Sequence, residues 1–118
     1  TGAAHETGVG NVVNLPLPDG CSSARFRTTW EHEVFPRVAA FKPELLLISA
    51  GFDAHADDPL AGMMLQENDF AWITNKLCDL ADEHCSGRIV SALEGGYDLE
   101  ALGRSVRAHV DVLKERAK

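Results

Sequence analysis

The chain has 118 residues, which is enough for one domain or for part of a larger one. Its hydrophobic fraction of 45% and charged fraction of 25% are ordinary for a globular protein, so disorder is not indicated. The net charge of -7 and the lack of a basic cluster argue against nucleic acid as a direct partner.

The cysteine spacing and the length of the apolar runs indicate the cellular compartment of the protein. Cys21, Cys78 and Cys85 are far apart and form no CxxC pair, so neither a zinc knuckle nor a disulfide framework is expected. A reducing, cytoplasmic location is the natural expectation. No apolar run approaches the roughly 20 residues that cross a bilayer, so a membrane is not an expected partner. The opening residues lack the features of a signal peptide and have no initiator methionine, which suggests excision from something longer.

The first part of the chain predicts a loop, a short strand and a long helix. Residues 1–10 are small and rich in glycine, and residues 11–15 have the composition of a strand that ends at a proline. A helix capped by one of the serines at its start is expected over residues 22–41. Pro36 should kink or interrupt it. Its apolar face consists of Phe26, Trp30, Val34, Val38 and Phe41.

The rest of the chain alternates strands and helices. We expect strands over residues 44–50 and 88–93, a helix over about 67–85 and a last helix after residue 98. The two helices should bury apolar faces, which consist of Phe70, Ile73, Leu77 and Leu80 in the first and of Leu99, Leu102, Val106, Val110 and Leu113 in the second.

Local signals mark the ends of these two helices. Gln66 stands where a serine or threonine would cap the first helix better, and Gly87 supplies a left-handed cap at its end. Asp98 can cap the last helix. The helix over 67–85 therefore has a clear end and a poorly marked beginning.

The alternation of strands and helices predicts an α/β fold with a mostly parallel sheet. The run Leu45–Ala50 is apolar throughout, as in a central strand that is buried on both faces. Loops that leave the carboxyl ends of adjacent parallel strands lie side by side, and open α/β sheets bind their ligands there. Asp53 and Tyr97 follow two such ends, so we expect them to be neighbours.

Asp53 and Tyr97 have the chemistry of half a hydrolytic site. A carboxylate is a suitable ligand for Zn²⁺, Mn²⁺ or Mg²⁺. Tyr97, the single tyrosine, follows Gly95 and Gly96, which allow close approach of a substrate. Its hydroxyl could donate to the oxyanion that forms during amide hydrolysis. Catalytic zinc generally takes three protein ligands, so two are missing from this half-site.

The same residues could also have purely structural roles. An aspartate after a strand often caps a turn, and the ring of Tyr97 could simply cover the sheet edge. Asp57 and Asp58 precede a proline, and we expect one of them to support the loop by accepting backbone N–H bonds. Asp53-Ala54-His55 has the form of a two-residue ligand pair, and the residues alone leave the role of His55 open. The other histidines are expected at the surface or at the edge of the core.

Three motifs then resemble one family. The segments TGAAHETGVGNVVNLPLP, ISAGFDAHADDPLAGM and ALEGGYDLEAL, in this order, are similar to segments of the histone deacetylase superfamily, which includes bacterial deacetylase-like amidohydrolases and acetylpolyamine amidohydrolases. The resemblance implies the arginase–deacetylase fold, a three-layer α/β fold with a mostly parallel sheet flanked by helices. It also implies Zn²⁺ as the cofactor and an acetylated amine, either acetyl-lysine in a protein or an acetylpolyamine, as the substrate.

The resemblance assigns roles to five positions. Asp53 matches the third zinc ligand, and Tyr97 matches the tyrosine that polarises the acetyl carbonyl. Gly95, Gly96 and Leu60 match residues along the acyl tunnel. His55 does not match a ligand; the related two-metal manganese hydrolases have an aspartate there, so His55 favours a single metal.

Other parts of the family pattern are missing. The family's upstream His-His pair and upstream Asp-x-His metal motif do not occur, and the resemblance makes Asp53-Ala54-His55 a local coincidence. Residues 1–118 therefore correspond to about the C-terminal third of the catalytic domain. The resemblance implies a zinc-dependent deacetylase whose isolated C-terminal fragment is inactive. Two alternatives remain: a non-catalytic interaction module, which could self-associate through exposed sheet edges, and a two-metal ureohydrolase-like enzyme, which His55 and the Gly-Gly-Tyr motif disfavour.

Overall fold

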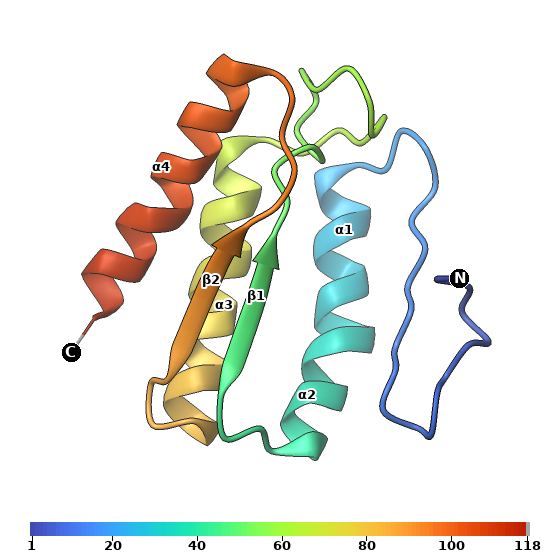
Figure 1. Ribbon diagram of the computed structural model, residues 1–118, viewed down its shortest axis with the longest axis vertical. Coiled ribbons are helices and arrows are strands. Elements are labelled where there is room, and N and C mark those ends of the chain that lie inside the picture. Colours follow the sequence, from blue (N-terminus) through green and yellow to red (C-terminus); the bar gives the residue numbers. More distant parts are fainter. Residues whose placement is uncertain (118) are drawn as a thin grey trace.

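A computed structural model describes residues 1–117 (Figure 1). The elements follow one another as α1 (Ser23–Thr29), the π-helical turn η1 (Trp30–Val34), α2 (Phe35–Phe41), β1 (Leu46–Ala50), α3 (Glu67–His84), β2 (Ile89–Leu93) and α4 (Leu99–Arg116). None of the described helices is long and apolar enough to span a membrane.

The two strands are parallel, with Leu46 opposite Ile89 and Ala50 opposite Leu93. Helix α3 connects them and lies behind the sheet, with α4 on one side of it and the α1–α2 helix on the other (Figure 1). This arrangement confirms the predicted α/β class. Within residues 1–117 the sheet has two strands and helices on one of its faces.

The predicted break near Pro36 is present. The π-helical turn Trp30–Val34 interrupts the helix, and Pro36 lies in the first turn of α2, where its missing N–H leaves no hydrogen bond unmade. Ser22 caps the beginning of α1 by accepting the N–H of Arg25. Lys42, with a left-handed φ of 54°, ends α2.

The beginning of α3 is fixed by a capping box in which Gln66 is the N-cap and Asp69 is the reciprocal acidic side chain. Asp69 is fully buried, accepts the Gln66 N–H at 3.0 Å and lies 2.8 Å from the guanidinium of Arg27. At the other end Ser86 and Gly87 both have positive φ, and the Gly87 N–H donates to a carbonyl of the last turn. The left-handed cap predicted at Gly87 is therefore confirmed.

The strand predicted over residues 11–15 is wrong. This segment has no ladder partner within residues 1–117, and its hydrogen bonds are those of a loop. The Val12 N–H donates to Thr7, and the Asn14 side chain donates to the carbonyls of Ala3 and Glu6. A strand-like composition forms a strand only where another strand is available for pairing.

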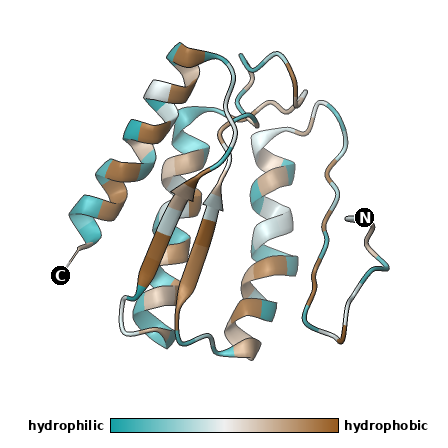
Figure 2. Ribbon diagram, in the orientation of Figure 1, coloured by the Kyte–Doolittle hydropathy of each residue, from teal (hydrophilic) through white to brown (hydrophobic). Residues whose placement is uncertain are grey.

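The prediction that β1 is buried on both faces is also wrong for the described chain. The helices cover the face that carries Ile48 and Ala50, whereas Leu47 is 73% exposed and Val90 of β2 is 54% exposed. Both strands are nevertheless apolar over much of their length (Figure 2). One face of the sheet is thus apolar and bare.

The buried face of α4 agrees with the predicted one only in part, since Leu102 and Val106 pack against the core as expected. Leu99 and Val110 are exposed, and the residues that the helix buries are Ala101, Ser105, His109 and Val112. Small and polar side chains on this face let α4 pack closely on α3 and the sheet. Phe41, predicted to belong to the apolar face of the first helix, is also exposed.

His109 joins the layers through hydrogen bonds. The Thr74 hydroxyl donates to the Phe70 carbonyl at 2.5 Å, so its oxygen accepts the Nδ1–H of His109 at 2.7 Å. Nε2 of His109 lies 2.9 Å from the Ser91 hydroxyl. Burial lowers the pKa of His109, which keeps the ring neutral and the network satisfied. The apolar core beside it consists of Ala50, Phe52, Leu65 and Phe70.

Candidate active site

The loops that follow β1 and β2 lie side by side, as expected. Two backbone hydrogen bonds extend the contact beyond the strands, one from Glu94 N–H to Ala50 at 2.9 Å and one from Phe52 N–H to Gly95 at 2.8 Å. This places Asp53 against the second loop. The contact joins the segments that carry Asp53 and Tyr97.

Glycines make room for the Asp53 carboxylate. A Cβ added to Gly95 would lie 2.9 Å from Oδ2 of Asp53, and one added to Gly51 would lie 2.9 Å from Oδ1. Any larger residue at either position would push the carboxylate away. Gly51 therefore belongs to the site, although its role was not predicted from the sequence.

The Asp53 carboxylate has no hydrogen bond or ion pair with the described residues, unlike its neighbours Asp57 and Asp58. It is partly buried beside Gly51 and Gly95, and its oxygens remain available to a ligand. This environment fits a single oxygen ligand of a divalent metal. Residues 1–117 contain no group of three potential ligands, so further ligands would have to come from elsewhere.

Asp58 fixes the backbone of Tyr97. Its Oδ2 accepts the Tyr97 N–H at 2.8 Å, and its Oδ1 accepts the Leu60 N–H at 2.9 Å. Burial favours the neutral form of this carboxyl, but the backbone N–H bonds outweigh burial and lower the pKa of Asp58. Asp58 is thus the acidic residue that supports the loop.

Gly96 is required for a conformational reason. Its φ of 137° is a conformation that side chains disfavour, and an added Cβ would lie 2.7 Å from Cδ1 of Leu102. The Tyr97 side chain that follows is 57% exposed. Leu60 is 69% exposed, so the described residues do not enclose it in a tunnel.

Asp57 and His55 have structural contacts that the sequence pattern did not reveal. Asp57 is exposed and pairs with Arg104 of α4 at 3.0 Å. His55 is 1% exposed, and its Nδ1 accepts the Asp57 N–H at 3.0 Å. Its Nε2 lies 3.4 Å from Oε1 of Glu67. His55 is therefore an internal support of the loop, which its spacing from Asp53 gave no means to predict.

Glu67 and Arg104 anchor the same loop to the helices. A hydrogen bond from Arg104, assisted by the Glu67 backbone N–H, lowers the pKa of Glu67 to about 2. Because Arg104 also pairs with Asp57, it connects α3, α4 and the loop after β1. Contacts with both α3 and α4 therefore fix the loop that carries Asp53.

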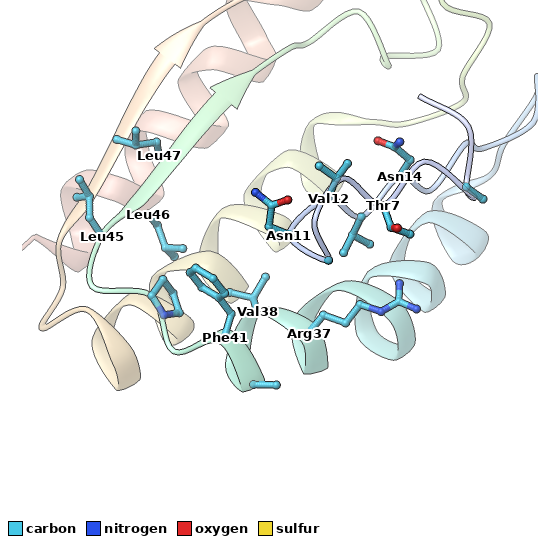
Figure 3. A pocket seen from close by; sticks show the side chains of 15 residues that line it. Thr7, Asn11, Val12, Asn14, Arg37, Val38, Phe41, Leu45, Leu46 and Leu47 are labelled. Carbon is cyan, nitrogen blue, oxygen red and sulfur yellow. The ribbon is translucent and has the colours of Figure 1, made fainter. Parts of the chain in front are cut away.

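A hollow of the described chain lies away from this site. It has a volume of about 1000 Å³ and is lined by the N-terminal loop, α2 and the first residues of β1 (Figure 3). Asp53 and Tyr97 lie beyond the opposite ends of the strands. The cavity and the candidate chemistry are thus separate features.

Comparisons with known proteins agree with the fold and the motifs. Residues 1–113 match the model of the histone deacetylase domain. Type-2 histone deacetylase 2 of Dictyostelium discoideum is 43% identical over 109 residues, which are 90% of this chain and 6% of that protein. The chloroplastic histone deacetylase 10 of Oryza sativa subsp. japonica is 43% identical over 110 residues, 90% of this chain and 25% of that protein.

Solved structures give the same result. The HDA15 HD domain superposes with a TM-score of 0.90 and 36% identity, over 99% of this chain and 33% of that one. The histone deacetylase Clr3 superposes with a TM-score of 0.87 and 28% identity, over 95% of this chain and 19% of that one. The chain therefore spans a third or less of these proteins, and it belongs to the histone deacetylase family.

Proposed function

We propose that the chain is the C-terminal part of the catalytic domain of a zinc-dependent deacetylase, which hydrolyses the acetyl amide of acetyl-lysine or of acetylpolyamines to acetate and a free amine. Family membership supports the deacetylase class. The observation that carries the assignment to these residues is the unpartnered Asp53 carboxylate beside the loop of Tyr97.

Asp53 would be one of the zinc ligands. Its carboxylate is held between Gly51 and Gly95 and has no competing cation or donor among the described residues. A bound zinc ion supplies Lewis acidity toward the acetyl carbonyl and lowers the pKa of a water molecule. The remaining ligands would come from a part of the domain outside residues 1–117.

Tyr97 would donate a hydrogen bond from its phenol to the acetyl oxygen as negative charge develops there. Asp58 fixes the Tyr97 backbone, and Gly96 provides the turn that precedes it. Such preorganisation matters because a donor that is already in place needs no reorientation during the reaction. Gly95, Gly96 and Leu60 would border the path of the acyl group.

The isolated chain should be inactive. Hydrolysis also needs a general base close to the attacking water. The one histidine on the loop of Asp53, His55, is 1% exposed and already accepts the Asp57 N–H, so it is not placed for this role. The three cysteines are free and buried, which is compatible with a reducing compartment such as the cytoplasm.

A chimaeric domain tests the proposal. This chain would replace the matching third of the HDA15 HD domain, which superposes on 99% of it. The chimaeric domain should bind zinc and deacetylate an acetyl-lysine peptide, and Asp53→Asn should reduce both zinc content and activity. The matched control is Asp57→Asn on the same loop, which should change neither. If Asp53→Asn leaves zinc content and activity unchanged, Asp53 is not a ligand.

A non-catalytic interaction module is the second candidate function. The bare apolar face of the sheet, with Leu47 and Val90 exposed, favours it because such faces normally have a partner. The same chimaeric domain separates the two functions. A folded chimaera with bound zinc and no deacetylase activity would favour the interaction module.

A further inference from the structure

Phe52 links the candidate site to the core. It immediately precedes Asp53 on the loop after β1, and its side chain is 4% exposed within the core. The Phe52 N–H donates to the Gly95 carbonyl at 2.8 Å, and a Cβ added to Gly96 would lie 3.4 Å from the Cβ of Phe52. A shift of Phe52 would therefore move both Asp53 and the turn that precedes Tyr97.

Rings from two helices contact the Phe52 side chain. The ring centroid of Phe70, on α3, lies 5.1 Å from that of Phe52, with an angle of 59° between the ring planes. The ring centroid of His109, on α4, lies 5.7 Å away with an angle of 63°, which is an edge-to-face contact. Phe52 therefore packs against side chains of both α3 and α4.

Hydrogen bonds at both nitrogens fix the orientation of the His109 ring. The Thr74 hydroxyl on α3 accepts the Nδ1–H at 2.7 Å, and Nε2 lies 2.9 Å from the Ser91 hydroxyl on β2. Because Nδ1 carries the proton, Nε2 accepts the hydrogen bond from Ser91. A rotation of the ring would break both bonds. Phe52 thus packs against a ring that has one orientation.

Packing alone does not require an imidazole at position 109. A buried polar ring is costly unless its nitrogens find partners, whereas an apolar side chain of similar size needs none. The hydrogen-bonded ring adds a defined geometry, since a fully satisfied polar network makes the core around it rigid. The ring with this property is one of the two that contact Phe52. This combination favours a positioning role for His109 over a purely stabilising one.

We infer that His109 is a positioning residue of the proposed active site, which acts through Phe52 on the Asp53 carboxylate and on the turn that precedes Tyr97. The inference rests on the proposed function, because it concerns the same zinc ligand and the same phenol. His109 is buried and both of its nitrogens are bonded, so it takes no direct part in the chemistry. A displacement of about 1 Å at a catalytic group can lower a rate about a hundredfold, so a remote ring can have a large effect.

His109→Leu in the chimaeric domain tests the inference. The leucine fills much of the space of the ring but makes neither hydrogen bond, so Phe52 loses its oriented neighbour. We expect kcat to fall about tenfold, with a similar fall in zinc affinity measured by competition with a chelator. KM should stay within about twofold of the parent value. The control is Val112→Ala, which changes a buried residue of the same helix outside these ring contacts and hydrogen bonds, and which should alter stability alone.

A double-mutant cycle tests the route through Phe52. Phe52→Leu should by itself lower kcat and zinc affinity. If His109 acts through Phe52, adding His109→Leu to Phe52→Leu should cause little further loss, so the combined effect is smaller than the product of the two. If His109→Leu does not fold, Ser91→Ala takes its place. That change removes one of the two bonds that orient the ring and should lower kcat and zinc affinity about threefold.

NMR spectroscopy supplies a measurement that needs neither zinc nor hydrolysis. The backbone amide signals of Asp53 and Tyr97 in the zinc-free chimaeric domain should shift in His109→Leu and stay in place in Val112→Ala. These shifts are expected even if Asp53 is not a zinc ligand. Failure of the inference is therefore distinct from failure of the proposed function.

Three results would overturn the inference. The first is a folded His109→Leu, or Ser91→Ala in its place, with the kcat, zinc affinity and amide signals of the parent domain. The second is an equal effect of Val112→Ala, since general destabilisation would then explain the loss. The third is that the effects of Phe52→Leu and His109→Leu multiply, because the two residues would then act independently.

Discussion

The backbone N–H of Tyr97 donates a 2.8 Å hydrogen bond to Oδ2 of Asp58, although the two residues are 39 positions apart in sequence. The other oxygen of Asp58 accepts the Leu60 N–H on its own loop. One carboxylate therefore ties together the loops that follow the two strands. The position of the proposed oxyanion donor depends on the loop that carries the proposed zinc ligand.

Asp58→Asn should impair catalysis more than zinc binding. An asparagine places an N–H₂ group against the N–H of Tyr97 or of Leu60, so one hydrogen bond is lost. We expect the kcat of the chimaeric domain to fall on the order of tenfold to a hundredfold through displacement of Tyr97. Zinc content should remain unchanged. Steady-state kinetics and metal analysis check this, with Asp57→Asn as the control; equal effects of the two substitutions would contradict the positioning role.

Gly95→Ala should displace the Asp53 carboxylate. The added methyl group would lie 2.9 Å from Oδ2, so the carboxylate or the loop must move. Weaker zinc binding by the chimaeric domain is the expected result, measured by titration against a chelator. The control is Gly103→Ala on α4, where an added Cβ contacts nothing within 4 Å. That change should leave zinc affinity unchanged and add up to about 1 kcal/mol of stability. Wild-type zinc affinity in Gly95→Ala would show that this contact is unimportant.

Local signals in the sequence were enough for much of the fold. Ser22 and Asp98 cap helices as predicted, Gly87 ends α3, and Pro36 marks a real break. Each of these features depends on residues within a few positions. The strands β1 and β2 were likewise predicted from compact apolar runs, and their parallel pairing followed from the helix between them.

Features that depend on distant partners were not predictable. Residues 11–15 have the composition of a strand but lack a partner strand in the described chain. The inward face of α4 is set by Ser105 and His109, whose burial depends on contacts with α3 and the sheet rather than on hydropathy. For the same reason the burial of His55 against Glu67 could not be inferred from its spacing. The position of Asp53 was predicted, whereas its lack of a partner is visible only in three dimensions.

Arg104→Gln should raise the pKa of Glu67 from about 2 toward its ordinary value of 4.5. A carboxyl whose folded pKa is lowered contributes stability above its ordinary pKa and loses it as the pH falls toward the folded value. The variant should therefore lose less stability than the parent between about pH 4.5 and 2. An NMR titration of the Glu67 carboxyl measures the pKa directly. Arg107→Gln is the control on the same helix, because Arg107 is exposed and pairs with Asp111 instead. If the pKa of Glu67 stays near 2 in Arg104→Gln, the hydrogen bond from Arg104 is not the cause of the lowered pKa.

His109 should make the chain less stable as the pH falls below about 6.5. Burial lowers its folded pKa, so the unfolded chain takes up a proton before the folded chain does. The free energy of unfolding should then decrease by at most about 1.4 kcal/mol per pH unit from this residue. Urea denaturation at several pH values should show a shallower dependence for His109→Gln. His32→Gln, at an exposed position, should show the same pH dependence of the free energy of unfolding as the parent chain. If all three proteins show the same pH dependence, His109 is not its source.

In the proposed mechanism this part of the domain supplies the oxyanion donor through Tyr97. The most direct measurement is the rate of acetyl-lysine hydrolysis by the chimaeric domain carrying Tyr97→Phe, at equal zinc content. We predict that kcat falls roughly a hundredfold to a thousandfold while zinc stays bound, since only the hydroxyl is removed. The unmodified 118-residue chain, assayed beside it, should show no hydrolysis. An unchanged kcat in Tyr97→Phe, or zinc-dependent hydrolysis by the chain alone, would contradict the account.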